Sequence, residues 1–591
     1  MVPRTYAFLF VLMFAAVAYP QLPLLPGEEK AVAEAKERRA RIVEQIAGDI
    51  AGLRLAENRA FVLARSGMLI CRDDKEAAKA MFQRAVGELT TAQLAAESEE
   101  RSGPSQSYVQ INRNLRPNIL TLIGGCDAEM ALESLYRTRT PSILRDLAAP
   151  PEITGRQIAN PNTYFSQTAQ TELMLEQRLL GLAAQQNPEI AAKVIQDSIK
   201  KGLSAETLGL LKRLYQKDPE TAATLARETL DRLLAGNFTP EPEDRNEIAL
   251  ANSILSDHLR QARPGTKELR FDDLQLRSLA SKYISYTIAQ SSRFPTAGNF
   301  SQAIRIAEKW SPAAVAGLRK LERERRPPGT QPQQMNPDAR RIIDSKSTPT
   351  QMMADAKRLP ADDRQFVYQS AANKMAAAGD YDGAIAVLNQ NFAGRALENA
   401  MNSLNAYHAG VLGNQGRWQE AENLIDQITL ENVRRSAMLE LASRAHAKDA
   451  QGNKGIALNL LRKVRNSMPN RPADQASTIW FVQLATAYAP IEAEEAFSLM
   501  DAVVPVLNEL ADANSIVSAF RSDSQVRQGE YLMVPNPAYG FQVVPSAWRA
   551  LMKADEERTS KLIDSFARRE IRISMRLQIA GDVPQPAPAV R

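Results

Sequence analysis

The sequence predicts an all-α fold in which helical-hairpin repeats stack into a superhelix, an α-solenoid with few or no strands. A turn motif recurs along the chain: Ala-Gly-Asp-Tyr-Asp-Gly-Ala at 378–384, Gln-Gly-Arg-Trp-Gln-Glu-Ala at 415–421 and Gln-Gly-Asn-Lys-Gly-Ile-Ala at 451–457. A weaker copy follows at 491–496, and the four closing alanines are 37, 36 and 39 residues apart. This period is typical of stacked two-helix units, each too small to bury its apolar face alone.

The composition supports the same fold class. A chain of 591 residues is too long for one compact core, so we expect several units or one extended array. Apolar residues make up 44% of the chain and aromatic residues only 6%. Alanine and leucine, which favour helices, dominate, and segments with the alternating pattern of strands are rare.

The first 27 residues predict export. A basic residue, Arg4, precedes an apolar run, and the run ends in Ala16-Val-Ala18, a pattern typical of a secretory signal peptide over 1–18. Residues 19–27 form a proline-containing spacer. We expect the mature protein in the periplasm or outside the cell. An uncleaved N-terminal membrane anchor is the alternative, because the leucines at 22–25 extend the apolar stretch.

Residues 28–322 predict an N-terminal helical solenoid. Its first helix is expected to run from Glu28 to about Leu69, where apolar residues recur at helical spacing. Asn187-Pro188 and Asp218-Pro219 each combine a capping side chain with proline at the first helical position, which predicts two helix starts.

The two cysteines, Cys71 and Cys126, each follow a predicted helix and precede an acidic helix start. At equivalent turns of neighbouring hairpins their sulfurs would meet, and export would allow a disulfide to form. The alternative is two separate buried thiols, because only geometry decides whether the sulfurs meet.

Residues 323–339, rich in proline and glutamine, predict a linker and a domain boundary. Regular repeats follow over 340–520. Residues 521–546 interrupt them with two short apolar runs around Asn536-Pro-Ala-Tyr-Gly540, which predict either a hairpin or, preferably, an extended strap packed on the helices. A helix pair is expected over 547–581 and a disordered tail over 582–591.

Residues 365–500 resemble tetratricopeptide repeats, in which small residues and a turn aromatic recur at fixed places. The matching sets are Ala372, Gly379, Tyr381 and Ala384, then Ala409, Gly416, Trp418 and Ala421, then Ala445, Gly452 and Ala457. Lys454 replaces the aromatic in the third repeat, and the fourth keeps only Ala496. The resemblance implies a concave groove lined by first helices that binds peptides or proteins. Carried over by position, the groove-facing candidates are Gln369, Asn373, Asn414, His446 and Asp449.

The charge pattern does not indicate nucleic-acid binding. The formal net charge is +5, with 73 basic and 68 acidic residues mostly interleaved along the chain. The strongest basic cluster is Arg568, Arg569, Arg572 and Arg576. We expect these arginines on an exposed helix face, with an anionic partner as the alternative reading.

The sequence contains no pattern typical of a catalytic centre. His258, His408 and His446 are far apart in sequence and lack metal-ligand spacing. We expect His408 to be buried and satisfied, because it falls on an inward-packing repeat position. No cofactor, metal or enzymatic activity is expected.

The leading hypothesis is an exported, non-catalytic scaffold that binds a protein or peptide partner. The alternatives are capture of a glycan or nutrient at the cell envelope and an enzyme with an unrecognised site. Ligand identity and oligomeric state stay open at this stage.

Overall fold

The computed structural model describes residues 26–100, 114–148, 167–236, 238, 245–260, 268–293, 300–324, 337–519, 526–533 and 545–581. The predicted signal peptide and tail lie outside these ranges, as do most of the spacer and most of the linker. The described chain is all-α, as the sequence predicts, with a single two-stranded hairpin among the described residues.

The helices before the linker form successive hairpins. They are α1 (Pro26–Ile50), α2 (Ala56–Ile70), α3 (Lys75–Glu100), α5 (Arg116–Cys126), α6 (Ala128–Arg137), α7 (Pro141–Ala148), α8 (Gln167–Gln186), α9 (Pro188–Lys201), α10 (Thr207–Tyr215), α11 (Pro219–Ala235), α12 (Arg245–Leu259), α13 (Asp273–Arg293), α14 (Phe300–Trp310) and α15 (Val315–Glu324). The helix α2 packs on α3, α5 on α6, α8 on α9, α10 on α11 and α12 on α13. The first helices of consecutive hairpins also touch one another.

The helices after the linker continue this pattern. They are α16 (Pro337–Asp344), α17 (Pro349–Ala356), α18 (Ala361–Ala377), α19 (Tyr381–Asn391), α20 (Gly394–Gln415), α21 (Trp418–Asp426), α22 (Glu431–Lys448), α23 (Lys454–Asn466), α24 (Gln475–Tyr488), α25 (Ala493–Ala519), α26 (Pro545–Ala554), α27 (Glu556–Asp564) and α28 (Arg569–Gly581). The expected C-terminal helix pair is therefore wrong, because this segment forms three helices. Asp555 interrupts it by capping α27 through the backbone N–H of Arg558.

Small residues permit the close crossing of each helical hairpin after residue 360. The closing alanines Ala384, Ala421, Ala457 and Ala496 are each 0% exposed, so a larger side chain at any of them would have no room. The first two turns end in left-handed backbone, with φ of 93° at Gly379 and 86° at Gly416, which glycine adopts without strain.

Local capping explains the predicted helix starts. Asp218 accepts a hydrogen bond from the N–H of Thr221 at 3.1 Å and Pro219 begins α11. Hydrogen bonds from the Thr221 side chain and from its backbone N–H favour the charged carboxylate, so they lower the pKa of Asp218. Pro188 likewise begins α9, although Asn187 makes no capping bond with its side chain.

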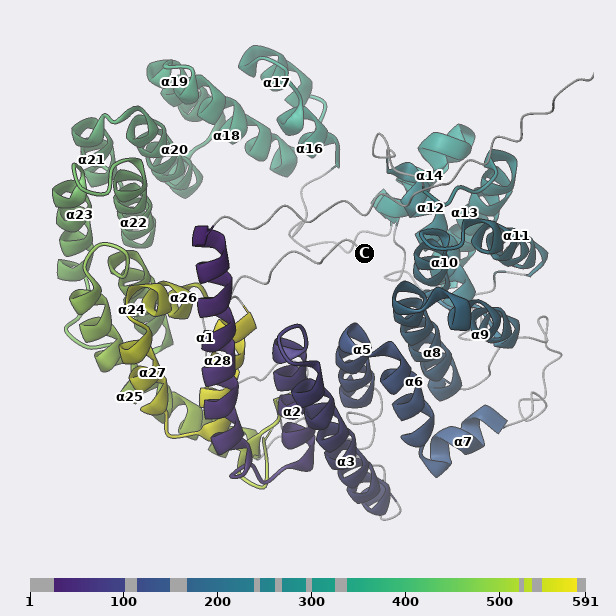
Figure 1. Ribbon diagram of the computed structural model, residues 1–591. Helices are drawn as coiled ribbons and strands as arrows, with labels where there is room; N and C mark the ends of the chain where they lie inside the picture. Colours follow the sequence, from purple (N-terminus) through teal and green to yellow (C-terminus); the bar gives the residue numbers. More distant parts are fainter. Residues whose placement is uncertain are drawn as a thin grey trace, which may run out of the picture.

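The two ends of the described chain meet in the middle of the stack (Figure 1). The first helix, α1, packs against the last helix, α28, and α2 packs against α28 as well. In space the order therefore runs from α16 through α25 to α26–α28, and then through α1–α6 to α15. In the sequence the linker lies between α15 and α16, and the buried residues on its two sides, 180–318 and 339–371, belong to separate clusters.

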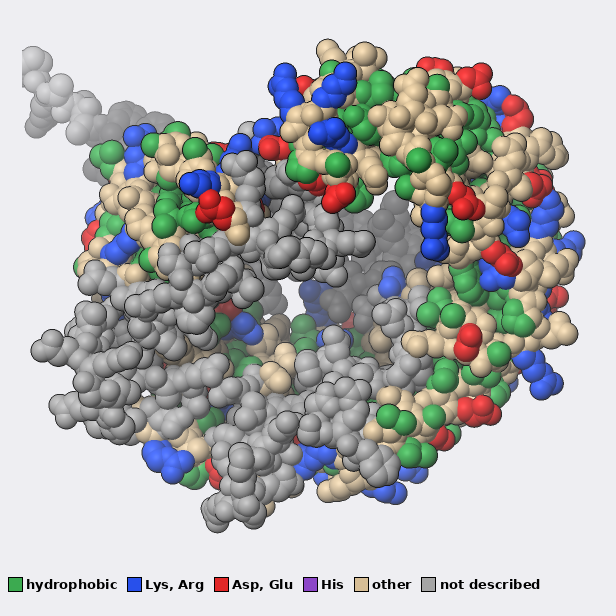
Figure 2. All heavy atoms as spheres, turned by 180° about the vertical axis from the view of Figure 1, so that it is seen from behind, with side chains coloured by type: hydrophobic (Ala, Val, Ile, Leu, Met, Phe, Trp, Pro, Cys, Tyr) green, Lys and Arg blue, Asp and Glu red, His purple; other side chains and the backbone are tan. Residues whose placement is uncertain are grey.

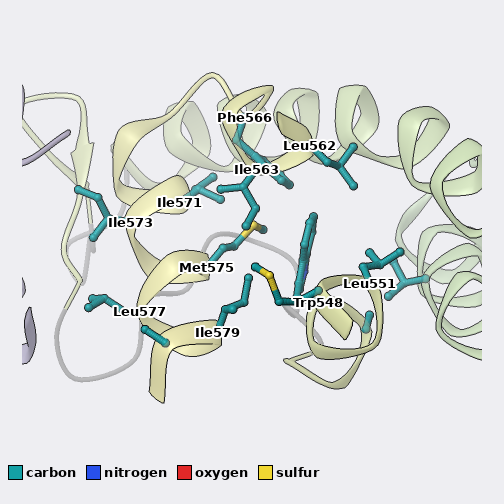
Figure 3. Packing of buried hydrophobic residues seen from close by; sticks show 14 of the residues in the cluster. Trp548, Leu551, Leu562, Ile563, Phe566, Ile571, Ile573, Met575, Leu577 and Ile579 are labelled. Atoms are coloured by element: carbon teal, nitrogen blue, oxygen red, sulfur yellow. The ribbon is translucent and has the colours of Figure 1, made fainter. Parts of the chain in front are cut away.

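The hydrophobic core crosses this junction. One cluster of buried residues includes members from 42–179 and from 409–580. Ile42, Val43, Ile46 and Ile50 of α1 belong to it together with the C-terminal helices. Figure 3 shows the C-terminal part, where side chains of α26, α27 and α28 converge. The rings of Trp548 and Phe566 pack edge to face there, with their centroids 5.8 Å apart. The predicted domain boundary at 323–339 does not separate this core.

Ion pairs surround the apolar contact between α1 and α28. Asp49 of α1 pairs with Arg572, at 2.6 Å, and with Arg576 of α28. Glu556 of α27 pairs with Arg38 at 2.9 Å and with Arg41 at 2.8 Å. We call this apolar contact with its ion pairs the terminal seam.

The expected exposed face is wrong for Arg568, Arg572 and Arg576, which are largely buried, whereas Arg569 is exposed. Arg568 pairs with Asp512 and Glu570, and Arg569 donates to the carbonyl of Gly52 at 3.2 Å. With Arg572 and Arg576 bound to Asp49, these arginines hold α28 to other elements of the chain. Asp49 and Asp512 are more than 50 residues away in sequence, and helical spacing alone gives no sign of them. The alternative reading, an anionic partner, stays a prediction.

The expected single helix over 28–69 is also wrong, because α1 ends at Ile50 and α2 begins at Ala56. A Cβ at Gly52 would lie 2.5 Å from the guanidinium of Arg569, whose exposed side chain would have to move to make room for it. The break lets both α1 and α2 contact α28.

The interrupting segment contains a hairpin of β1 (Val526–Arg527) and β2 (Glu530–Tyr531). Its turn is Gln528-Gly529, with φ of 50° and 75°, and Asn536-Pro-Ala-Tyr-Gly540 lies outside the described residues. Asn58 of α2 donates to Glu530 and to the Tyr531 carbonyl, and it accepts from the N–H of Met533. The stretch 530–533 is thus fastened onto α2 by backbone and side-chain hydrogen bonds.

The structure pairs Cys71 and Cys126 in a disulfide, with their Cα atoms 6.0 Å apart. Cys71 follows α2 and Cys126 ends α5, so the bond fixes neighbouring hairpins to each other next to the terminal seam.

The terminal seam predicts that replacing either of two acidic residues of α1 by its amide lowers the free energy of unfolding by unequal amounts. Asp49→Asn should lower the free energy of unfolding by about 3 kcal/mol, because Arg572 loses its carboxylate and Arg576 keeps only that of Asp564. Glu34→Gln, which breaks an exposed pair with Lys30, should change it by less than about 1 kcal/mol. Urea unfolding followed by circular dichroism measures both. Equal midpoints for the two variants would contradict a structural role for the seam.

The disulfide predicts that the unfolded, unreduced chain offers no thiol to a labelling reagent. Cys71→Ser combined with Cys126→Ser should lower the free energy of unfolding by about 4 kcal/mol, because the bond spans 55 residues. Thermal or urea unfolding of the oxidised wild type and the double variant measures the difference. Two reactive thiols in the unreduced protein would disprove the bond.

Candidate protein-binding surface

The first helices of the hairpins after the linker line the inner side of the curve. Figure 1 shows α18, α20, α22 and α24 facing inward, with α19, α21, α23 and α25 outside them. Each first helix contacts its own second helix and the neighbouring first helices, so its remaining exposed side faces the inside of the curve. We call the exposed side of α18, α20 and α22 the inner face.

Four of the five groove residues predicted from the sequence are engaged in hydrogen bonds within their own chain. Gln369 and Asn373 on α18 are half-buried, and the Gln369 amide donates to Asn373 Oδ1 at 3.3 Å and to the Ala400 carbonyl at 3.4 Å. Asp449 is exposed, but it caps the turn before α23 by accepting from the N–H groups of Gln451 and Gly452.

The other two groove residues lie on α20 and α22. Asn414 is exposed and accepts from Arg444 Nη1 at 2.5 Å, while its carbonyl accepts from Lys448 at 3.0 Å. His446 is half-buried, and its Nδ1 has no hydrogen-bond partner. The structure therefore joins Gln369 to Asn373 and Asn414 to the helix that carries His446, but it shows no bond that links these two groups.

Two aromatic side chains on the inner face were not among the predicted residues. Phe366 on α18 is 43% exposed and Tyr407 on α20 is 42% exposed, and α18 and α20 are neighbours. Phe366 lies next to the buried Val367, and Tyr407 lies next to the half-buried Ala406. Their place beside the apolar stripe of each helix is the sequence signal that identifies them.

The tryptophans serve packing instead. Trp548 and Trp310 are buried, and the Trp310 indole donates to Asp273 at 3.1 Å. The ammonium group of Lys448 lies 5.7 Å from the centre of the Trp418 ring, which links α21 to α22. This arrangement leaves little aromatic surface of tryptophan for stacking on a sugar.

The turn aromatic Tyr381 links one hairpin to the next. Its hydroxyl donates to Asn405 Oδ1 at 2.6 Å, and its ring stacks on His408 with centroids 4.7 Å apart. The expectation of a buried, satisfied His408 is wrong in part, because the residue is half-buried and its Nδ1 lacks a hydrogen-bond partner. Burial and the nearby Arg417 lower the pKa of His408.

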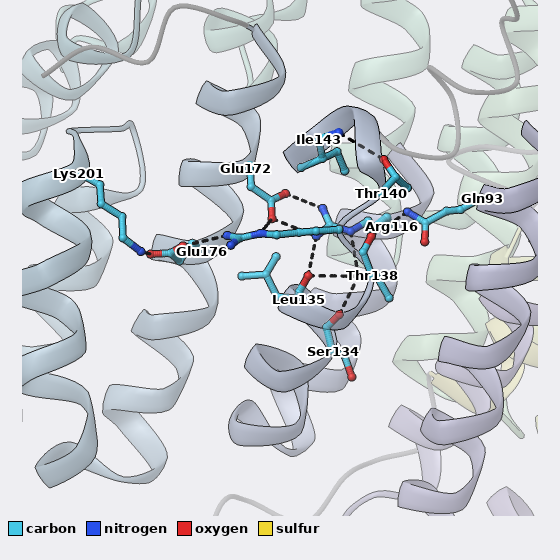
Figure 4. Close-up of polar contacts among 11 residues, drawn as sticks. Gln93, Arg116, Ser134, Leu135, Thr138, Thr140, Ile143, Glu172, Glu176 and Lys201 are labelled. Carbon is cyan, nitrogen blue, oxygen red and sulfur yellow. Dashed lines mark hydrogen bonds and ion pairs between the residues drawn. The ribbon is translucent and has the colours of Figure 1, made fainter. Parts of the chain in front are cut away.

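A buried ionic network joins the hairpins before the linker (Figure 4). Arg116 of α5 donates to both oxygens of Glu172 on α8, at 2.6 and 3.1 Å, and to the Leu135 carbonyl of α6. Arg139 binds Glu172 and Glu176, and Lys201 of α9 binds Glu176 at 2.8 Å. No sequence motif marks these residues, because they come from four separate elements.

The electrostatics of this network exclude acid catalysis by Glu172. Burial alone would raise the pKa of Glu172, but the two arginines outweigh it and lower the pKa. A carboxylate held in its charged form does not donate a proton near neutral pH. The network is therefore suited to fixing the angle between hairpins, since its guanidinium and carboxylate groups are hydrogen-bonded to one another.

Within the described ranges, no group of three or more His, Cys, Asp or Glu side chains has the arrangement of a metal site. His258 is buried, with Nδ1 3.0 Å from the Ile254 carbonyl and Nε2 accepting from the Phe271 N–H at 3.3 Å. None of the described helices has the length and apolarity to cross a membrane.

The surface carries both signs of charge. Figure 2 shows lysine and arginine interspersed with aspartate and glutamate over the face seen from behind, in agreement with the interleaving in the sequence. Comparisons with family models, with curated proteins and with solved structures give no match to this chain.

The burial of His408 beside Tyr381 predicts that its imidazole titrates with a lowered pKa. Because the folded-state pKa of His408 is lowered, the stability that its neutral form provides is present above the unfolded value of about 6.5 and is lost as pH falls through the folded value. Proton NMR of histidine-labelled protein, assigned with His408→Gln, should show a midpoint below about 6.5. Tyr381→Ala, which uncovers the ring, should raise it. A midpoint at or above the ordinary value would contradict the burial.

Proposed function

We propose that this protein is an exported, non-catalytic helical-repeat scaffold that binds a peptide segment of a partner protein on its inner face. The repeated hairpins support this proposal, because stacked first helices present a long, continuous surface. The disulfide supports export, because such bonds persist in oxidising compartments. The tetratricopeptide-like sequence pattern over 365–500 supports the same class of binding.

The exposed pair Phe366 and Tyr407 is the observation that carries the proposal. Large aromatic side chains supply much of the binding energy at protein interfaces and are usually buried in a free protein. Both residues are more than two-fifths exposed on adjacent first helices. Polar groups of Asn414 on α20 and of Glu440 and Arg444 on α22 supply a hydrogen-bonding rim.

A peptide selection tests this assignment. Twelve-residue random peptides displayed on phage are selected on the full chain, and the enriched peptides are measured by fluorescence polarisation. Phe366→Ala combined with Tyr407→Ala should weaken binding by about 30-fold, since truncating two interface anchors removes about 2 kcal/mol or more. The helical circular dichroism and the melting temperature should stay unchanged, because both rings are exposed.

The matched control is Leu274→Ala, which removes another large apolar side chain, 72% exposed on α13. Leu274 lies on a second helix before the linker, so its loss should leave the affinity unchanged. Equal weakening by the control and the double variant would contradict binding at the inner face, and so would full affinity in the double variant.

A further inference from the structure

The imidazole of His258 joins two segments in the part of the curve where α12, α13 and α14 pack together (Figure 1). His258 lies in the last turn of α12 and is 8% exposed. Its Nδ1 lies 3.0 Å from the carbonyl oxygen of Ile254 in the same helix. Its Nε2 accepts the backbone N–H of Phe271 at 3.3 Å, in the segment 268–272 that leads into α13.

These two contacts determine the protonation state of the ring. A carbonyl oxygen only accepts hydrogen bonds, so Nδ1 carries a proton. Nε2 accepts an N–H, so it carries none. The neutral form with the proton on Nδ1 is therefore the form that satisfies both backbone groups. A second proton on Nε2 would face the hydrogen of the Phe271 amide and would replace this hydrogen bond by a repulsion.

The surroundings of the ring favour its neutral form. Burial has the largest effect and lowers the pKa of His258. Two cations lower it further, Arg270 in the 268–272 segment and Lys309 of α14. Lys309 is fixed near the ring, because its ammonium group donates to the His258 carbonyl at 2.6 Å. The hydrogen bond from Nδ1 to the backbone acts in the opposite direction but does not outweigh these effects.

The acidic groups near the ring are paired with other cations. Asp257, the neighbour of His258 on α12, favours the protonated ring, but its carboxylate is paired with Lys212 of α10. Glu268 is paired with Arg270 at 3.4 Å. Among the described residues, both ring nitrogens bond to backbone groups and neither bonds to a carboxylate. A proton added to the ring therefore finds no acidic partner that would hold it.

We infer that His258 is an acid-sensitive switch: its neutral ring ties residues 268–272 to α12, and protonation at Nε2 releases them. The ring of Phe271 packs edge to face against the imidazole, with centroids 5.4 Å apart, so its release also removes an apolar contact. Asp272 caps the start of α13 directly after Phe271. An acidic surrounding thus loosens the packing of α13 on α12 while the rest of the curve stays closed.

Hydrogen exchange at the Phe271 amide, measured by NMR on the full disulfide-bonded chain and corrected for the intrinsic rate, tests the inference. The folded-state pKa of His258 is lowered, so the stability that the neutral ring provides is present above about 6.5 and is lost as pH falls through the folded value. Protection should therefore fall by up to about tenfold for each pH unit below about 6.5. Constant protection down to about pH 5 would overturn the inference.

His258→Gln is the diagnostic variant, because a glutamine side-chain oxygen accepts an N–H and does not titrate in this range. It should keep the Phe271 amide protected at neutral pH and remove the pH dependence. His446→Gln, the matched control, removes a histidine on α22 and should retain the wild-type profile. An undiminished pH dependence in His258→Gln would show that another group controls the segment and would overturn the inference.

Nitrogen-15 NMR of the wild-type histidines tests the geometry without altering His258. Its signals are assigned by elimination with His408→Gln and His446→Gln. At neutral pH the ring of His258 should carry its proton on Nδ1 and none on Nε2. A proton on Nε2 at neutral pH, in either the neutral or the charged ring, would contradict the switch even if His258→Gln failed to fold.

Discussion

The contact between α1 and α28 determines how the rest of the molecule is arranged. Ile42, Val43, Ile46 and Ile50 are buried there, and burying each such side chain contributes about 2 kcal/mol. Asp49 then orients α28 through Arg572 and Arg576. Through this contact one buried cluster includes residues from before and after the linker, while residues 180–318 and 339–404 form clusters of their own.

Two kinds of joint maintain the curve away from the terminal seam. After the linker, fully buried alanines allow each hairpin to close tightly, and turn aromatics such as Tyr381 reach the next first helix. Before the linker, the buried network of Arg116, Glu172 and Glu176 takes the corresponding role. The alanine and aromatic contacts leave a regular surface of first helices. The ionic network instead uses specific charges to hold less regular hairpins.

The sequence predicted the helical class because that class depends on local patterns. Alanines and glycines at fixed spacing specify helix crossings and turns without reference to distant residues. It failed where distant residues decide the outcome, as at Gly52, whose turn admits Arg569 from the far end of the chain. Distant residues also decide the environment of the arginines of α28. In the sequence they resemble an exposed basic face, because their carboxylate partners lie elsewhere in the chain.

The candidate surface was predicted only in part, because family positions place residues on a face but not their partners. Gln369 and Asp449 lie on the expected elements, yet their polar groups are used by the chain itself. Phe366 and Tyr407 lie beside the apolar stripes of α18 and α20, and the structure adds that both side chains are more than two-fifths exposed.

Because α1 completes its packing with residues more than 500 positions later, the terminal seam cannot form until the end of the chain has been made. Contacts that span so much chain form slowly, and a helix whose apolar side lacks its partner is exposed to aggregation. The helix α1 is synthesised long before α28, so its contact surface for α28 stays uncovered until α28 has been made. A chain that crosses a membrane unfolded and folds on the far side would meet this requirement, because both ends are then free at the same time.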